Sequence, residues 1–247
     1  MSRYDFDAPR LFVEGDLSAG VRLALERAQA NYLLNVLRLG AGDDILIFNG
    51  RDGEWRASVE PDGRKSAQLV VGAQTRPQPR SPDAAYCFAP LKHARLDYMV
   101  QKAVEMGATA LCPVITRRTQ AARVNLERMR ANAIEAAEQC GVLTLPSIAA
   151  ETRFDAWVAT FDPDRLLIFC DEDAENAPLP ALAAAAKASR ALSVLIGPEG
   201  GFDPAERATL LRLPNVLRLS LGPRILRADT AAVAALALTQ AALGDWR

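Results

Sequence analysis

The sequence contains a single histidine, His93, among its 247 residues. A histidine-rich metal site and most Ser-His-Asp mechanisms therefore lack a necessary residue. The cysteines Cys87, Cys112, Cys140 and Cys170 lie 25 to 30 positions apart, without the close pairs that zinc or redox sites use. We expect no metal site, an ordinary place for His93 at a helix start, and reduced cysteine thiols in the core.

Long apolar runs are also missing. No stretch of about eighteen or more apolar residues occurs, and the first residues lack a basic head followed by an apolar core, so neither a membrane span nor a signal peptide is supported. Half of the 247 residues are nevertheless apolar, which is enough to bury the core of one large domain or two ordinary ones. We expect a soluble, cytoplasmic protein that does not associate with a membrane.

The formal net charge is only −1, but the basic residues are unevenly distributed. Between Arg76 and Arg130 there are ten lysines and arginines and four acidic residues, whereas the segments on both sides carry an acidic excess. A basic segment on an otherwise acidic chain favours contact with a phosphate backbone. An ordinary solvated surface explains the same distribution equally well.

Residues 1–74 predict a β-rich domain. Short apolar runs are separated by Asn-Gly and Asp-Gly turns, which is typical of hairpins. The expected strands are RLFV, VRLAL, DDILIFNG, EWRASVE and SAQLVV. One helix is expected over residues 29–40, where apolar residues recur at helical spacing and Gly40 is placed to cap the end. Together these elements predict a small barrel with an inserted helix.

Residues 74–82 contain three prolines and no large apolar residue, which predicts a linker. Strand patterns, among them ALCPVI at residues 110–115 and ALSVLI at residues 191–196, alternate with helix patterns from there to the end. Residues 75–247 therefore predict an α/β domain with a mostly parallel sheet. Gly107 and Gly141 are expected to cap helices, and Asp203 with Glu206 forms a predicted capping box. The last helix, residues 230–243, is apolar almost all round, so its own sheet or a second subunit should bury more than one face.

Two glycine-bearing turns, IGPEGGF at residues 196–202 and LGPRILRADTA at residues 221–231, are predicted to follow neighbouring apolar strands. Ligands of open α/β sheets bind beyond the carboxyl ends of the strands, so the two turns are expected to meet at one site. Gly197, Gly200 and Gly201 permit close backbone approach and positive φ. Neither turn has the glycine spacing of a nucleotide triphosphate or dinucleotide site.

The second turn concentrates ionisable side chains: Arg224, Arg227 and Asp229 fall within six positions. A purely structural loop has little reason to combine them, although Asp229 or the following Thr230 would also serve as a simple helix N-cap. The acidic residues 171–175 are interpreted as a solvated loop.

These two turns together resemble the paired signature of the ribosomal small-subunit (16S) RNA uridine-N3 methyltransferases, the RsmE family of the SPOUT superfamily. The likeness extends over nearly the whole chain and includes RLFV, NYLLNVLRLGAGDDILIFNG, QKAVEMG, Arg118 after PVIT, and AAEQCG with Glu138. Two positions depart from the usual family pattern: Asp229 stands where glutamate is usual, and Val142 where arginine is usual.

The resemblance implies a PUA-like or OB-like barrel in residues 1–74 and, in residues 75–247, a SPOUT-type α/β domain with a deep trefoil knot. It also implies a homodimer that acts on ribosomal RNA or the small ribosomal subunit, with S-adenosylmethionine as methyl donor. The residues carried over as the donor-binding lining are Leu195, Ile196, Gly197, Glu199, Gly200, Leu219, Leu221, Gly222, Ile225 and Leu226.

Methyl transfer to uridine N3 requires alignment of the nitrogen with the methyl group and stabilisation of the charge that spreads onto the uracil oxygens. Arg224 is the first candidate for that stabilisation, with Arg227 as a second donor or a phosphate clamp. Glu138, Asp229 or water is the proton acceptor.

Lys92, Arg95 and Arg118 are expected to contact RNA phosphate. The alternatives are a non-catalytic RNA-binding or ribosome-assembly module of the same fold, and a methyltransferase that acts on another RNA position or on transfer RNA.

Overall fold

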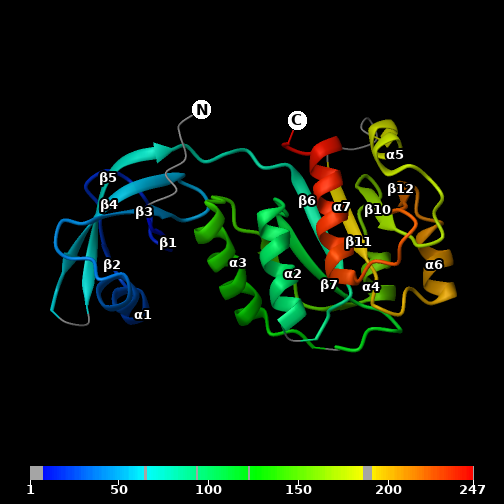
Figure 1. The fold of residues 1–247 in the computed structure, drawn as a ribbon, viewed down its shortest axis with the longest axis horizontal. Coiled ribbons are helices and arrows are strands. Elements are labelled where there is room, and N and C mark those ends of the chain that lie inside the picture. Colours follow the sequence, from blue (N-terminus) through cyan, green and yellow to red (C-terminus); the bar gives the residue numbers. More distant parts are fainter. Residues whose placement is uncertain (1–7, 64–65, 93, 122, 186–190, 247) are drawn as a thin grey trace. The chain divides into compact units, whose positions relative to one another are not determined.

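The computed structural model describes residues 8–63, 66–92, 94–121, 123–185 and 191–246, so His93 lies outside the described part. The chain divides into two compact units (Figure 1): Met1–Arg80 with Ala137–Thr144, and Ser81–Ala136 with Leu145–Arg247. The first unit reaches Arg80 and includes a segment of the later chain, and the domain boundary between residues 74 and 75 stays a prediction.

The N-terminal unit is built on a five-stranded sheet. The strands lie in the order β1 (Arg10–Phe12), β3 (Asp44–Phe48), β4 (Glu54–Pro61), β5 (Ala67–Arg76) and β2 (Arg22–Ala24). β1 pairs with β3 in parallel and the other neighbours are antiparallel. All five predicted strands are confirmed, because alternating apolar residues such as Ile45, Ile47, Val59 and Leu69 form one buried core. Closure of this sheet into a barrel stays a prediction.

The predicted helix of this unit is present but shorter than expected. It consists of α1 (Arg27–Asn31) and a π-helical turn, η1 (Tyr32–Val36), which buries Leu33 in the core. The chain leaves the helix at Arg38, whose φ of 60° is left-handed. The prediction that Gly40 caps the helix is therefore wrong: the wider π turn ends the helix earlier, and Arg38 takes the left-handed conformation.

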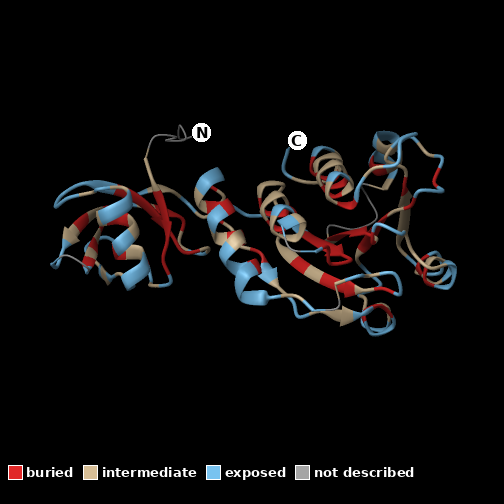
Figure 2. Cartoon of the chain, turned by 60° about the horizontal axis from the view of Figure 1, so that its bottom comes forward, coloured by how far each residue is buried: buried red, intermediate tan, exposed pale blue. Residues whose placement is uncertain are grey.

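The C-terminal unit contains a parallel sheet, as predicted. Its strands lie in the order β12 (Val216–Leu219), β10 (Leu166–Cys170), β11 (Ala191–Ile196), β6 (Asp83–Phe88), β7 (Ala110–Ile115) and β8 (Ser147–Ile148), and β9 (Thr152–Arg153) pairs with β7. Every pair is parallel. Figure 2 shows that buried residues concentrate in these strands, which explains their nearly continuous apolar sequences.

Helices cover both faces of this sheet. Alternate residues of β6 divide between the faces: Cys87 packs with α4 (Phe154–Ala159) and α6 (Pro204–Leu210), whereas Tyr86 contacts Met99 of α2 (Ala94–Glu105). α7 (Ala228–Ala242) packs beside α2 and against β11, as Figure 1 shows. The other helices are α3 (Leu126–Cys140) and α5 (Pro178–Ala185).

The predicted helix ends are largely confirmed. Gly107 and Gly141 follow α2 and α3 with positive φ, and Asp203 caps α6 in a capping box with Glu206. α7 buries small and apolar residues against α2, α5 and β11. The short segment β8–β9–α4 was not predicted. Its strands are two residues long, which is too short for a periodic pattern.

All four cysteines are free thiols, as expected. Cys87 is buried and Cys112 and Cys170 are half-buried, but Cys140 is exposed at the end of α3, so its assignment to the core is wrong. None of the described helices is long and apolar enough to cross a membrane.

Candidate active site

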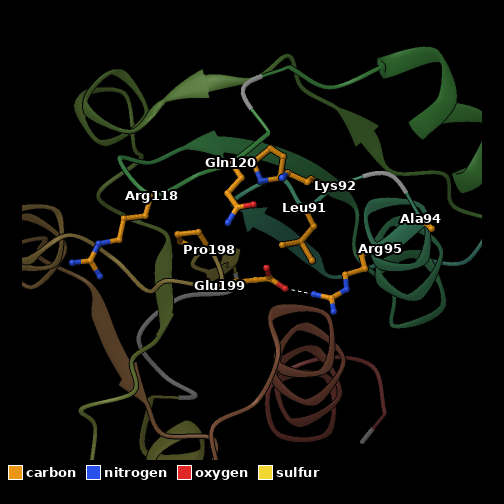
Figure 3. A pocket seen from close by; sticks show the side chains of 9 residues that line it. Leu91, Lys92, Ala94, Arg95, Arg118, Gln120, Pro198 and Glu199 are labelled. Atoms are coloured by element: carbon orange, nitrogen blue, oxygen red, sulfur yellow. Dashed lines mark hydrogen bonds and ion pairs between the residues drawn. The ribbon is translucent and has the colours of Figure 1, made fainter.

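A cavity of about 460 Å³ opens beyond the carboxyl ends of the parallel strands (Figure 3). Parallel strands end at the same edge of a sheet, so the segments that follow β6, β7 and β11 are brought together there. The described residues that line the cavity are Pro90, Leu91, Lys92, Ala94, Arg95, Arg118, Gln120, Pro198 and Glu199. All three cations predicted to contact RNA thus lie around one cavity, with the first glycine-bearing turn as part of its wall.

The first turn, residues 197–201, needs glycine for two separate reasons. Gly201 has a φ of +69°, which side chains rarely adopt. At Gly197 the reason is space, because a Cβ atom there would lie 2.7 Å from Cε2 of Phe202. The Phe202 ring is itself held edge-on against Phe169, with centroids 5.3 Å apart. The turn is therefore fixed by an aromatic cluster on the sheet.

Arg95 joins two acidic residues at the cavity. Its Nη1 pairs with Oε1 of Glu199, as the dashed line in Figure 3 shows, and its Nε lies 4.0 Å from Oδ2 of Asp229. The structure therefore brings together a predicted RNA contact, a predicted donor contact and a predicted catalytic carboxylate. Asp229 lies in the first turn of α7, where the helix dipole stabilises a negative charge.

The other two predicted RNA contacts have different surroundings. Arg118 donates from Nη1 to the carbonyl oxygen of Gly200 at 2.6 Å, which ties the segment after β7 to the first turn. Lys92 is exposed, and its side chain makes no hydrogen bond or ion pair with any of the residues that the structure describes. It is thus a cation at the cavity that remains available for a phosphate.

The second turn follows β12, and β10 lies between β12 and β11. The prediction that the two turns follow neighbouring strands is therefore wrong, and roughly two strand spacings, about 10 Å, separate their starting points. No described residue of the second turn lines the cavity of Figure 3. Its segment from Gly222 to Ile225 is exposed, and Ile225 reaches 102% relative exposure.

Arg224 and Arg227 are both exposed on this turn. Within the described ranges, neither side chain forms a hydrogen bond or an ion pair. α7 begins at Ala228 with Arg227 as its N-cap, so the interpretation of Asp229 or Thr230 as the N-cap is wrong. The carboxylate of Asp229 instead accepts a hydrogen bond from the Thr230 N–H at 2.9 Å.

Two family models match the chain: an RNA methyltransferase domain over residues 79–240 and an RNA methyltransferase PUA domain over residues 25–72. The ribosomal RNA small subunit methyltransferase E of Synechocystis is 32% identical over 239 residues, which cover 96% of this chain and 78% of that protein. The chain belongs to the ribosomal RNA small subunit methyltransferase E family.

Other members of the methyltransferase E family agree along the whole length. The protein from Rickettsia conorii is 28% identical over 229 residues, covering 92% of this chain and 93% of that protein. A crystal structure of the family member from Neisseria gonorrhoeae bound to S-adenosyl methionine is 26% identical, with a TM-score of 0.88, covering 97% of this chain and 100% of that one.

Not every donor contact carried over from the family is accessible. The side chains of Leu195, Ile196 and Leu219 are buried at 0%, 3% and 0% exposure, at the ends of β11 and β12. We therefore expect S-adenosylmethionine to contact the backbone of these three residues and not their side chains. Leu221 and Leu226 are half-buried.

Glu138 belongs to the N-terminal unit, whereas Arg224, Arg227 and Asp229 belong to the C-terminal unit. Its Oε1 accepts a hydrogen bond from the backbone N–H of Phe12 at 2.8 Å. This contact fixes the last turn of α3 to β1. Glu138 and the other three catalytic candidates thus belong to different units, and the role of Glu138 as a base stays a prediction.

Sequence reasoning did not predict that two carboxylates near the turns are buried. Asp171 is 4% exposed and pairs with two arginines, so its assignment to a solvated loop is wrong. Glu206 is 6% exposed and accepts from the backbone N–H groups of Asp203 and Arg117, which links α6 to the segment after β7. Only the capping box signalled Glu206, and nothing in the local sequence signals the partners of Asp171.

Substitution of Gly197 by alanine tests the tight packing of the first turn. The added methyl group would force Phe202 or the turn to move, so we expect S-adenosylmethionine to bind roughly tenfold more weakly, or worse. Isothermal titration calorimetry measures this directly. Gly40→Ala is the matched control, because of all described atoms only the Asp43 carboxylate oxygen would lie within 4 Å of its Cβ, at 3.8 Å. Equal donor affinity of Gly197→Ala and wild type would contradict the expectation.

Proposed function

We propose that this protein transfers a methyl group from S-adenosylmethionine to N3 of a uridine in small-subunit (16S) ribosomal RNA. Membership of the methyltransferase E family and the likeness to a relative crystallised with that donor support the proposal. The observation that carries it is the cavity at the carboxyl edge of the sheet. Three cationic side chains line this cavity, and the first glycine-bearing turn forms part of its wall.

The two turns suit a donor that is bound largely by backbone groups. Gly201 and Gly222 both have positive φ, and space is open where a side chain of Gly222 would point. The fully exposed Ile225 offers an apolar surface for a nucleoside. S-adenosylmethionine supplies an electrophilic methyl group on a sulfonium, so the chain's own task is to orient the acceptor and stabilise its charge.

Arg224 stabilises the charge that develops on the uracil oxygens when N3 loses its proton. Its guanidinium is exposed on the second glycine-bearing turn, where an acceptor base can reach it. Arg227 is a second donor or a phosphate clamp. Asp229, in the first turn of α7, accepts the proton in this proposal, and its contacts with the Thr230 N–H and with Arg95 support that role. Glu138 and water are the alternative proton acceptors.

Lys92, Arg95 and Arg118 guide the RNA backbone to the cavity. The PUA domain contributes a second RNA-binding surface. We further propose that the chain between β10 and α7 forms the SPOUT trefoil knot, that two copies form a homodimer, and that the enzyme acts in the cytoplasm, where ribosomes are assembled.

Calorimetry with S-adenosylmethionine, followed by methylation of unmodified small subunits and mass-spectrometric mapping of the product, tests this function. We expect donor binding and one new methyl group on N3 of a single uridine. A protein that binds RNA but neither binds nor uses the donor would be a non-catalytic module. A methyl group at another position, or on transfer RNA, would replace the proposed specificity.

A further inference from the structure

Asp171 lies immediately after β10, the strand between β11 and β12. The two glycine-bearing turns start from the carboxyl ends of those flanking strands. The carboxylate of Asp171 is therefore placed between the two segments that are proposed to hold the donor.

Each flanking segment supplies one arginine to this carboxylate. Arg207 of α6, the helix that follows the first turn, donates from Nε to Oδ1 at 3.1 Å and from Nη2 to Oδ2 at 3.0 Å. Arg218 of β12, three residues before Leu221, donates from Nε to Oδ2 at 2.7 Å. A single carboxylate thus connects the elements on which both turns are built.

Neighbouring residues strengthen the same connection. Asn176 donates to the carbonyl oxygen of Arg218 at 2.5 Å and accepts from the backbone N–H of Ser220 at 3.0 Å, directly before the second turn. Glu172 lies against the first turn, since a Cβ atom on Gly201 would come within 2.9 Å of its Oε1. The segment that begins at Asp171 therefore contacts both turns.

The burial of Asp171 shields its ion pairs from screening by water and salt. Its side chain is 2% exposed, whereas the side chains of Arg207 and Arg218 are 29% and 38% exposed. Burial raises the pKa of Asp171, but the hydrogen bonds from Arg207, Arg218 and the Asp173 backbone outweigh it, and the pKa stays below its ordinary value. The carboxylate is thus held charged in one place by donors from two directions.

We infer that Asp171 is a positioning residue, which sets the spacing of the two donor-binding turns through Arg207 and Arg218. The inference rests on the proposed function, because it needs both turns to hold the donor. A donor bound by backbone groups from two segments is sensitive to their separation, because each hydrogen bond weakens steeply once its donor and acceptor atoms move out of range.

Asp171→Asn is the decisive variant, because the amide keeps the size of the side chain but replaces one acceptor oxygen by a donor facing a guanidinium. We expect its dissociation constant and KM for S-adenosylmethionine to rise roughly 100-fold, the effect of losing about two hydrogen bonds to the methyl donor. Its KM for the RNA and its kcat at saturating donor should stay near the wild-type values. A general loss of structure would instead alter all of these quantities, so the split separates positioning from folding.

Asp173→Asn is the matched control, because Asp173 is 68% exposed and its carboxylate approaches Arg207 only to 3.4 Å. We expect little change in donor affinity. If Asp171→Asn does not fold, Arg218→Lys provides the test, since it keeps the charge but removes the planar guanidinium. We then expect weaker donor binding with unchanged KM for RNA.

Wild-type protein that fails to bind S-adenosylmethionine would overturn the proposed function itself. Wild-type protein that binds the donor while Asp171→Asn, or Arg218→Lys in its place, binds it equally well would overturn only the positioning role. Equal weakening by Asp173→Asn would also overturn it, because the effect would then belong to acidic charge in the loop.

Discussion

Arg224→Ala should lower kcat roughly 100- to 1,000-fold, the range seen when one hydrogen-bond donor to a developing oxyanion is removed. The affinity for S-adenosylmethionine should stay nearly unchanged, because the Arg224 side chain is exposed and makes no hydrogen bond to other described residues that could shape the donor-binding turn. Single-turnover methylation of unmodified small subunits measures the first quantity, and calorimetry measures the second.

Arg212→Ala is the matched control, because Arg212 is also exposed and, among the described residues, its side chain donates a hydrogen bond only to the Thr209 hydroxyl, at 3.2 Å. We expect that variant to retain wild-type turnover. Arg224→Lys should recover part of the activity, since it restores the charge without the planar fork. A loss of donor binding that accounts for the whole loss of turnover would show that Arg224 shapes the turn instead.

Glu54→Gln should destabilise the protein by about 3–5 kcal/mol, as expected when one partner of a buried ion pair is removed. The Glu54 carboxylate accepts from Arg10 Nε at 3.0 Å, from Arg76 Nε and Nη2 at 2.9 Å and 2.6 Å, and from the Thr75 hydroxyl at 2.8 Å. The side chains of Arg10 and Glu54 are only 4% and 3% exposed, so Arg10 would be left as a buried cation without this carboxylate. Urea-induced unfolding measures the loss.

Glu60→Gln on the same strand is the control. Glu60 pairs with Arg22, but their side chains are 45% and 59% exposed, so the expected loss is at most about 1 kcal/mol. Similar losses in the two variants would show that burial of Glu54 does not strengthen its ion pairs.

The buried carboxylate of Glu54 also predicts how the stability of the protein depends on pH. Burial raises the pKa of Glu54, but hydrogen bonds from Arg76, Thr75 and Arg10 outweigh this and hold the pKa below its ordinary value. A carboxyl with a lowered folded-state pKa stabilises the fold fully above the unfolded-state pKa of about 4.3 and loses that contribution as pH falls further. The unfolding free energy of wild type should therefore decline below about pH 4.3, and that of Glu54→Gln should decline less steeply.

Much of the fold could be predicted from local patterns. β7 and β11 match the predicted segments residue for residue, because a strand buried on both faces requires an uninterrupted apolar sequence. The capping box at Asp203 and the glycines after α2 and α3 were equally predictable, since helix ends need particular side chains. The short β8–β9–α4 segment has no such pattern.

The site was predictable in part for the same reason. The glycine-bearing turns, and Lys92, Arg95 and Arg118, were identified from motifs and from a resemblance, and the last three do lie at one cavity. Strand order was not predictable, because β10 inserts between β11 and β12 through contacts among segments far apart in the chain. The place of Glu138 in the N-terminal unit was not predictable either, because it also depends on contacts between segments far apart in the chain.

The sequence by itself determined the types of secondary structure, the parallel sheet and the two turns, since each depends on residues within a few positions of one another. Only the tertiary structure decided that Asp171 is a buried, doubly paired carboxylate and that Arg95 joins Glu199 to Asp229. These properties depend on charges that approach from distant segments. No local sequence pattern can predict these ion pairs, because the packing of the sheet and helices decides which charged side chains meet.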